Sequence, residues 1–444
     1  MRCARIETVH SDALAEGVAL FNRGKFFEAH EALEDFWRSA PPEQKKFLQG
    51  VVQVAVAFHH HSTGNHVGMR SVLERACRNM AENSGCFVRV NVPPLLKSLN
   101  EWQITMRESR PTPPLPRIEL CDNSLTPMPT QSAITPADAE AARGRIQGIA
   151  FRTPLVRCYA DAPAELYLKL ENLQPIGSFK IRGAANVMAL TRRDQLALGV
   201  LTASAGNMAQ GVAFCAKRVG VPATIVAPDT APATKIRAVE RLGGRVIQVP
   251  FAEWWRTFET RSYPGVDATF IHAFDDPHVM AGNGTIALEL LEDLPDLDAV
   301  VIPWGGGGLA SGIAAVLRAR HPHARIYAAE IETAAPLAAS LAAGEPRTVD
   351  YKPSFVDGIG SKMVFPSMFE LGRHLLDGSL VVTLAEAAQA MKILAERNRI
   401  IIEGAAACAV AAALSGRAGK GKVVAIVSGG NIDLDKFAQL TASA

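Results

Sequence analysis

The stretch Glu171–Gly183, ENLQPIGSFKIRG, places one lysine, Lys180, on a turn between two glycines. Pro175 and Gly177 interrupt the helical pattern before it, and apolar side chains flank it. A lysine amine adds to an aldehyde only in its neutral form, whereas an exposed lysine is almost fully protonated at neutral pH. Because burial lowers the pKa of an amine, this chemistry requires a partly desolvated pocket. A solvated surface position is the common alternative for an arbitrary lysine.

The composition is that of a large globular chain. Its 444 residues predict two or three domains. A net charge of +2, with no dense Lys/Arg run, argues against a nucleic-acid partner. Seven scattered cysteines, never spaced C-x-x-C, argue against a disulfide framework or a zinc ribbon and favour a cytoplasmic location. The start has no secretion-signal pattern and no apolar run approaches the roughly 20 residues of a membrane span, so we expect a soluble protein.

Residues 1–108 are predicted to form an all-helical domain. Bulky positions recur at i, i+4, i+7 and i+11 as one stripe of an amphipathic helix: Phe26, His30, Leu33 and Trp37. A helix over residues 43–61 is apolar around most of its circumference and is expected at the centre of a small bundle. Two further helices are predicted over residues 67–83 and 93–107.

The segment FNRGKFFEAHEALEDFWR, residues 21–38, resembles a small helical family without an assigned function. His30 and Glu34 lie one helical turn apart, which is compatible with metal ligation. Because His30 shares the apolar stripe, a core histidine is the favoured interpretation. The run His59–His61 is expected at a solvated helix end. We therefore predict a structural or interaction module without a metal site.

Six prolines between residues 110 and 130 predict a semi-rigid spacer over residues 109–132, followed by a catalytic domain over residues 133–444. That domain opens on a helix with Thr135 as N-cap and Pro136 at its first position. Short β-branched runs then alternate with helices, which predicts an open α/β fold with parallel strands. The runs are residues 199–202, 223–227, 245–249, 299–303, 325–329 and 422–427; the helices include residues 208–219, 234–242, 309–320 and 385–398.

Three of these strands end in motifs with a chemical use. Gly305–Gly308 precede a helix, so their N–H groups could close around a phosphate, although a glycine run can also be a plain loop. Ser204–Asn207 precede another helix and would suit a substrate carboxylate; the alternative is an ordinary N-cap. Ser428 follows the last strand, where a hydroxyl could bond a pyridine nitrogen, or where S-G-G-N could simply be a turn.

The motifs SFKIRG, SAGNMAQG, GGGGLASG and SGGNID resemble, in this order, the serine/threonine dehydratase family. These are pyridoxal-phosphate (PLP) enzymes of the tryptophan-synthase-β fold type, and the resemblance covers roughly residues 133–444. It implies two subdomains with open, mostly parallel sheets, and a homodimer. The implied reaction is loss of the β-hydroxyl of L-threonine or L-serine as water, which leads to a 2-oxo acid and ammonia.

The resemblance also implies site residues. Lys180 would form the Schiff base and remove the substrate Cα proton, and Asn207 would bond the phenolic oxygen of the cofactor. The implied cofactor-binding residues are Phe179, Lys180, Asn207, Gly305, Gly306, Gly307, Gly308, Glu403 and Ser428. The implied substrate-binding residues are Ser204, Ala205, Gly206 and Asn207.

The chain departs from the family pattern at several positions. Serine racemases carry a second serine where this chain has Ala205, so racemisation is disfavoured, and Met208 replaces a usual histidine. Glu330 matches a cation ligand of some members, but Pro336 stands where an aspartate would complete that site, so we expect it to be absent or altered. Two alternatives stay open: elimination or replacement on another amino acid, such as 3-hydroxyaspartate or a cysteine derivative, and a PLP-binding sensor without catalysis.

Overall fold

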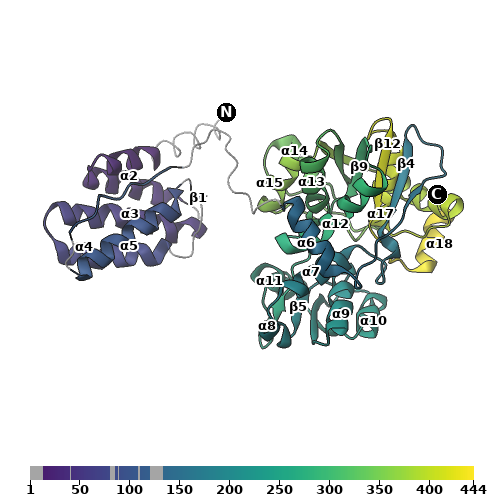
Figure 1. Ribbon diagram of the computed structural model, residues 1–444, viewed down its shortest axis with the longest axis horizontal. Helices are drawn as coiled ribbons and strands as arrows, with labels where there is room; N and C mark the ends of the chain where they lie inside the picture. Colours follow the sequence, from purple (N-terminus) through teal and green to yellow (C-terminus); the bar gives the residue numbers. More distant parts are fainter. Residues whose placement is uncertain (1–13, 41, 81–85, 89, 109–110, 121–133) are drawn as a thin grey trace. The chain divides into compact units, whose positions relative to one another are not determined.

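A computed structural model describes residues 14–40, 42–80, 86–88, 90–108, 111–120 and 134–444. The chain divides into two compact units, residues 1–129 and residues 130–444 (Figure 1). Within the described residues, no helix combines the length and the apolar character that crossing a membrane requires.

The first unit is a helical bundle. Its helices are α2 (Phe26–Ser39), α3 (Pro42–Ser62), α4 (His66–Met80) and α5 (Val92–Glu108). The α3 residues Val51, Val54 and Phe58 are fully buried, which confirms that this helix is the centre of the bundle. A short antiparallel hairpin of β1 (Cys86–Phe87) and β2 (Val90–Asn91) was not predicted, because two-residue strands leave no periodic pattern.

The prediction that His30 lies in the core is wrong. The buried stripe of α2 consists of Phe26, Ala29 and Leu33, and His30 lies at its edge with 29% of its side chain exposed. There its Nε2 lies 3.2 Å from Oε2 of Glu34. The histidines at the end of α3 are partly buried rather than solvated, and the Trp102 ring of α5 lies against His61 at 4.9 Å between ring centroids.

Part of the predicted spacer belongs to the helical bundle. Ile118 is 1% exposed and lies in the core of this unit. The indole Nε1 of Trp102 donates to the carbonyl oxygen of Pro114 at 3.0 Å. Residues 111–120 thus pack on the bundle, whereas residues 121–132 of the predicted spacer lie outside the described residues. The domain boundaries themselves stay predictions.

The second unit contains two sheets, and the larger one has six strands in the order β11-β10-β9-β12-β4-β3. All neighbouring pairs are parallel except β3 with β4. The strands are β3 (Leu155–Arg157), β4 (Glu165–Leu170), β9 (Ala299–Pro303), β10 (Arg325–Ile331), β11 (Gly378–Val382) and β12 (Lys422–Val427). Because β9, β12 and β4 are adjacent, loops far apart in the chain meet at their carboxyl ends.

The smaller sheet has four parallel strands in the order β7-β6-β5-β8. These are β5 (Val200–Ala203), β6 (Ala223–Pro228), β7 (Arg245–Val249) and β8 (Thr269–Phe270). All six predicted strands are present, so the predicted open α/β architecture in two subdomains is confirmed. The strands β3, β4, β8 and β11 were not predicted. β3 and β8 are short, and β4 mixes charged with apolar residues, so these three lack a clear β-branched run.

Helices cover both sheets (Figure 1). They are α6 (Pro136–Ile146), α7 (Lys180–Leu190), α8 (Arg193–Ala197), α9 (Asn207–Val219), α10 (Ala233–Arg241), α11 (Phe251–Thr260), α12 (Pro277–Asp293), α13 (Gly308–Arg320), α14 (Pro336–Ala343), α15 (Pro366–Leu375), α16 (Leu384–Ile393), α17 (Gly404–Leu414) and α18 (Leu434–Ala442). The predicted cap of α6 is confirmed, because Thr135 and Asp138 form a reciprocal capping box. Helix α12 packs against both α7 and α13.

Candidate active site

The turn that carries Lys180 is fastened to the end of β12. The N–H of Phe179 donates to the carbonyl oxygen of Ser428 at 3.0 Å, and the N–H of Gly430 donates to that of Gly177 at 2.9 Å. Gly177 has a φ of +69°, in the left-handed region that glycine adopts without strain. Lys180 then begins α7, so its backbone is fixed from both sides.

The Lys180 side chain points into a protein-lined site. Its Nζ donates to the carbonyl oxygen of Ala273, just beyond β8, at 2.6 Å, and lies 5.0 Å from the ring centroid of Phe179. Burial lowers the pKa of this amine to about 8, although the nearby carboxylate of Glu403 opposes the shift. This geometry therefore agrees with the sequence-based expectation that Lys180 lies in a partly desolvated pocket and has a lowered pKa.

Asn207, Glu403 and Asn431 form one polar cluster from three different loops. The Asn207 amide Nδ2 donates to Oε1 and Oε2 of Glu403 at 2.8 and 3.1 Å. Its Oδ1 accepts from Nδ2 of Asn431 at 2.8 Å. Burial raises the pKa of the Glu403 carboxyl to about 7, while the bond from Asn207 works in the opposite direction. The amide of Asn207 is thus engaged on both sides.

The loop Ser204–Gly206 joins β5 to the start of α9. The Ser204 Oγ accepts from the N–H of Gly206 at 3.2 Å, and all three residues are partly exposed. Since α9 begins at Asn207, its first N–H groups face this loop and carry the partial positive charge of a helix N-terminus. The arrangement suits a carboxylate.

The glycine run between β9 and α13 admits no larger residue at three of its positions: Gly306, Gly307 and Gly308. A Cβ at Gly306 would overlap the ring of Phe274, and one at Gly308 would lie 2.6 Å from the Phe274 carbonyl oxygen. Among the described residues, no protein acceptor takes the N–H groups of Gly305–Gly308. Together with the start of α13 they form a set of donors for an anion such as phosphate.

The comparison with protein families decides the class of this site. Residues 146–429 match the family described as pyridoxal-phosphate dependent enzyme. The chain belongs to this family. Residues 14–72 of this PLP-dependent enzyme match a second family, a domain of unknown function, DUF309, which agrees with the small helical family expected for the front of the chain.

Three similar proteins extend the match. An L-threonine ammonia-lyase of Thermotoga maritima is 42% identical over 310 residues, 68% of this chain and 77% of the relative. The structure of maize serine racemase is 33% identical, covers 70% of this chain and 98% of its own, and has a TM-score of 0.65. The structure of the processed form of threonine deaminase isoform 2 from Solanum lycopersicum is 34% identical, covers 69% of this chain and 92% of its own, and has a TM-score of 0.64. The second unit of the enzyme thus has PLP fold type II.

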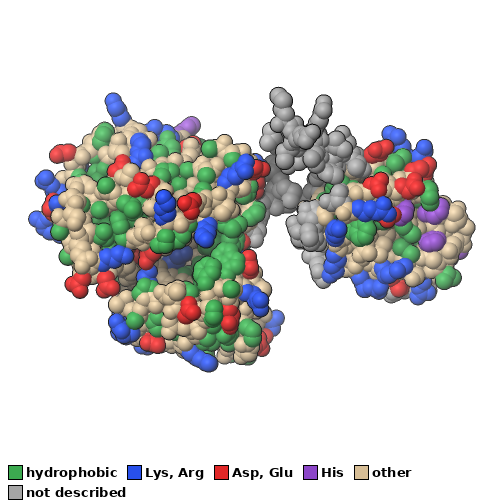
Figure 2. All heavy atoms as spheres, turned by 180° about the vertical axis from the view of Figure 1, so that it is seen from behind, with side chains coloured by type: hydrophobic (Ala, Val, Ile, Leu, Met, Phe, Trp, Pro, Cys, Tyr) green, Lys and Arg blue, Asp and Glu red, His purple; other side chains and the backbone are tan. Residues whose placement is uncertain are grey.

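The residues present fit the cofactor of this family. The glycine run offers free N–H groups to a phosphate, and Lys180 offers a buried amine of low pKa. Ser428, 2% exposed at the end of β12, has a hydroxyl with no protein partner among the described residues. Figure 2 shows a hollow in the surface of the second unit with hydrophobic side chains at its edge. A PLP molecule would therefore find a donor for each of its polar ends.

A buried ion network under α7 was not recognised from the sequence. Arg182, two residues after the lysine, donates to Glu171 and to Glu289 at distances of 2.7–3.0 Å, and Lys169 lies 2.6 Å from Glu289. All four side chains are 5% exposed or less, and the two carboxylates raise the pKa of Arg182. The sequence gives only two signals of this network: Arg182 beside Lys180, and Lys169 in β4. A charged residue is unusual within an apolar run. The network fixes the helix that begins with the lysine.

The carboxylate of Glu330 is used inside the protein. It accepts from the N–H groups of Leu337 and Ala338 at 2.8 and 2.7 Å and from Oγ of Ser379 at 2.6 Å. Pro336 begins α14 beside it. Among the described residues, no group of three or more His, Cys, Asp or Glu side chains could hold a metal ion. The altered cation site stays a prediction.

Proposed function

We propose that the enzyme is an ammonia-lyase that converts L-threonine or L-serine to a 2-oxo acid and ammonia through loss of the β-hydroxyl. The observation that carries this proposal is the position of Lys180. Its amine, with a pKa of about 8, lies 2.6 Å from the Ala273 carbonyl oxygen, and the turn that carries it is bonded to the backbone of Ser428. The relative from Thermotoga maritima is named for this reaction with threonine.

Lys180 moves the proton. At pH 7 roughly one in ten amines with a pKa of about 8 is neutral, against fewer than one in a thousand for an ordinary lysine. Bound PLP supplies electron withdrawal from the substrate Cα, which makes that proton removable. The Lys180 Nζ takes the Cα proton as a general base, and the resulting ammonium can give a proton to the departing β-hydroxyl.

The loop Ser204–Asn207 holds the substrate carboxylate. Its N–H groups at the start of α9, with the Ser204 hydroxyl, orient the amino acid so that its Cα–H faces Lys180. Ala205 presents no hydroxyl here, so the face opposite Lys180 lacks the proton carrier that racemisation needs. We therefore propose elimination rather than racemisation as the main reaction, although maize serine racemase is a structural neighbour.

The remaining residues hold the cofactor. The N–H groups of Gly305–Gly308 would bind its phosphate, Phe179 would lie beside its ring, and Ser428 would face its pyridine nitrogen. Asn207 would bond its phenolic oxygen. Because a hydroxyl does not protonate the pyridine nitrogen as a carboxylate would, the ring stays a moderate electron sink, which favours prompt elimination over transamination.

Two further proposals concern the whole protein. We propose a homodimer, as in the family that the motifs resemble. We also propose a cytoplasmic location, which is supported by free thiols at Cys77, Cys158, Cys215 and Cys408.

The test is release of 2-oxo acid by the purified holoenzyme across a panel of amino acids. L-Threonine and L-serine should react, and Lys180→Ala should abolish turnover. Preference for 3-hydroxyaspartate or a cysteine derivative would replace the substrate assignment. Absence of turnover with every amino acid, despite a full complement of PLP, would overturn the proposal in favour of a sensor.

A further inference from the structure

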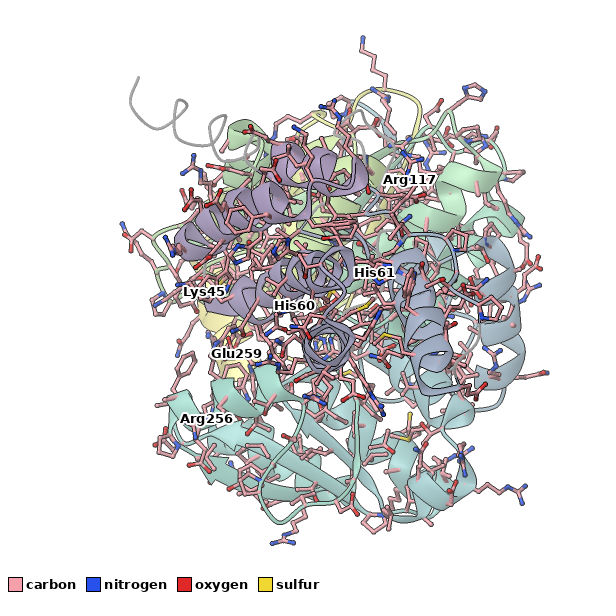
Figure 3. The ribbon with its side chains drawn as sticks, turned by 90° about the vertical axis from the view of Figure 1, so that its left-hand side faces the viewer. Lys45, His60, His61, Arg117, Arg256 and Glu259 are labelled. Carbon is pink, nitrogen blue, oxygen red and sulfur yellow. The ribbon has the colours of Figure 1, made fainter. Side chains whose placement is uncertain are left out.

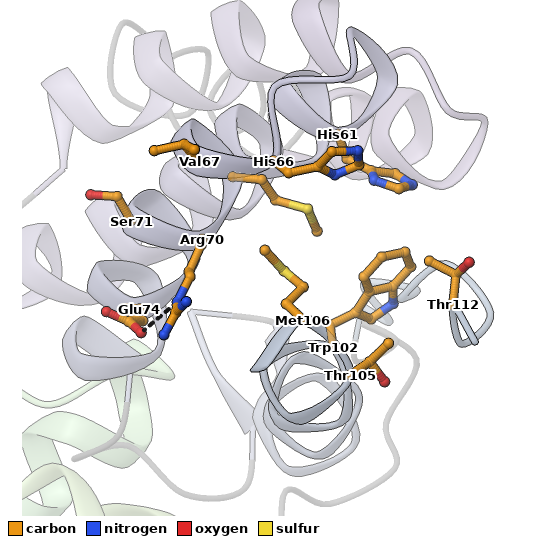
Figure 4. A pocket seen from close by; sticks show the side chains of 11 residues that line it. His61, His66, Val67, Arg70, Ser71, Glu74, Trp102, Thr105, Met106 and Thr112 are labelled. Carbon is orange, nitrogen blue, oxygen red and sulfur yellow. Dashed lines mark ion pairs between the residues drawn. The ribbon is translucent and has the colours of Figure 1, made fainter. Parts of the chain in front are cut away.

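A cavity in the helical bundle lies outside the PLP site. It has a volume of about 670 Å³, within the range of small-molecule sites. The end of α3, the first half of α4 and the second half of α5 enclose it. Figure 4 shows the lining residues His61, His66, Trp102 and Met106 around one space, with Arg70 beside it and turned toward Glu74.

One wall of this cavity is rich in hydrogen-bond donors. His66 and Arg70 are one turn apart at the start of α4, and the first turn of that helix contains no acidic residue. The helix N-terminus adds its own partial positive charge. Arg70 approaches Glu74 through Nε at 3.8 Å, a loose contact that leaves its other N–H groups available to a second anion.

His61 also lines the cavity. It belongs to the histidine run at the end of α3, where Figure 3 labels it beside His60. Its Nδ1 is shielded from solvent and, among the described residues, has no hydrogen-bond partner, so this atom does not face the cavity and only the rest of the ring lines it. Burial and the neighbouring His66 lower the pKa of His61, so at neutral pH the ring is uncharged and can donate one N–H.

The opposite wall is apolar. Trp102 is 2% exposed and Met69 is fully buried, and both line the cavity together with the partly buried Met106. The indole N–H of Trp102 is already bound to Pro114, so the ring offers only apolar surface. A ligand that fills this space therefore needs an apolar body as well as an anionic end.

We infer that this cavity binds a small organic monocarboxylate with an apolar body. The carboxylate pairs with Arg70 and accepts from His66, while the body packs on Met106 and on the small exposed part of Trp102. A bidentate guanidinium–carboxylate pair has the geometry for such recognition. A metal ion does not fit, because the lining brings an arginine and no group of three metal-binding side chains occurs among the described residues.

The test uses the full-length holoenzyme and benzoate as the probe. Saturation-transfer NMR should detect benzoate at millimolar concentration. Benzylamine, with the same body and the opposite charge, and inorganic phosphate, an anion without a body, should bind at least about tenfold more weakly. Arg70→Met should weaken benzoate binding by a similar factor. Arg78→Met, an exposed arginine on the same helix but outside the cavity, is the matched control and should leave it unchanged.

Benzoate could also enter the PLP site, so the titration is repeated with Lys180→Ala, which should retain the binding that depends on Arg70. A second measurement follows the His61 ring protons, which should shift with benzoate in the wild type and not in Arg70→Met. The inference is overturned if benzoate does not bind, if Arg70→Met and Arg78→Met behave alike, or if benzylamine competes equally. None of these results depends on turnover at Lys180.

Discussion

Asn207 and Glu403 join the two sheets of the PLP unit through a pair of hydrogen bonds of 2.8 and 3.1 Å. Asn207 begins α9, directly after β5 of the four-stranded sheet, and Glu403 is the N-cap of α17, which packs on the six-stranded sheet. The same carboxylate acts on Lys180, whose pKa it raises against the effect of burial. One partly buried acid therefore influences both the link between the subdomains and the basicity of the lysine.

Removing this carboxylate should make Lys180 a weaker base. In Glu403→Gln the pKa of the lysine should fall below its value of about 8, because desolvation then acts alone. The pH at which the apo-protein captures PLP at half its maximal rate, followed by visible absorbance, should move to lower pH. Glu345→Gln, at an exposed ion pair, is the control. A midpoint that stayed in place or rose would contradict the interaction.

The network around Arg182 should contribute strongly to the stability of the fold. Arg182→Met leaves the buried carboxylate of Glu171 without its cation, and we expect a loss of about 3–5 kcal/mol in the free energy of unfolding, measured with urea. Arg192→Met breaks an ion pair whose side chains are 75% and 65% exposed, and should change stability by less than about 1 kcal/mol.

The pH dependence separates this effect from simple loss of packing. In the wild type the pKa of Glu171 is lowered, so its stabilisation is present above its unfolded pKa and is lost as the pH falls through the folded value. In Arg182→Met the buried Glu171 has lost its arginine, so the pKa of its carboxyl should be raised. The free energy of unfolding of this variant should therefore fall as the pH rises. The difference between the two proteins should therefore grow from pH 4.5 to pH 7; a constant difference would indicate packing alone.

The sequence predicted the elements well and the contacts between them poorly. Strands such as residues 299–303 were recognised because β-branched runs have a local signature. The bond between Asn207 and Glu403 spans 196 residues and depends on which strands are neighbours, which is not a local property. Likewise, the stripe on α2 was misassigned because His30 was counted in place of the small Ala29, which is fully buried.

The glycine run should tolerate no side chain at Gly306. In Gly306→Ala the added Cβ would overlap the ring of Phe274, so the loop should shift and its N–H groups should lose their alignment. We expect PLP to be lost at least tenfold more readily on dialysis, scored by visible absorbance. Gly144→Ala, on α6 with no atom within 4 Å of the new Cβ, should keep its PLP and gain up to about 1 kcal/mol of stability. Equal retention in both variants would argue against this loop as the phosphate site.

Ala205 is the residue that we expect to separate elimination from racemisation. It lies between Ser204 and Gly206, before the helix whose first residue contacts Glu403, and it is partly exposed. A hydroxyl at this position would give the substrate a proton carrier on the face opposite Lys180. Ala205→Ser should thus produce D-serine from L-serine while 2-oxo acid release continues, and chiral chromatography of the reaction mixture measures both. Ala205→Gly, which adds no hydroxyl, should produce no D-serine. If Ala205→Ser also produced none while its elimination activity persisted, the proton carrier would have to lie elsewhere in the site.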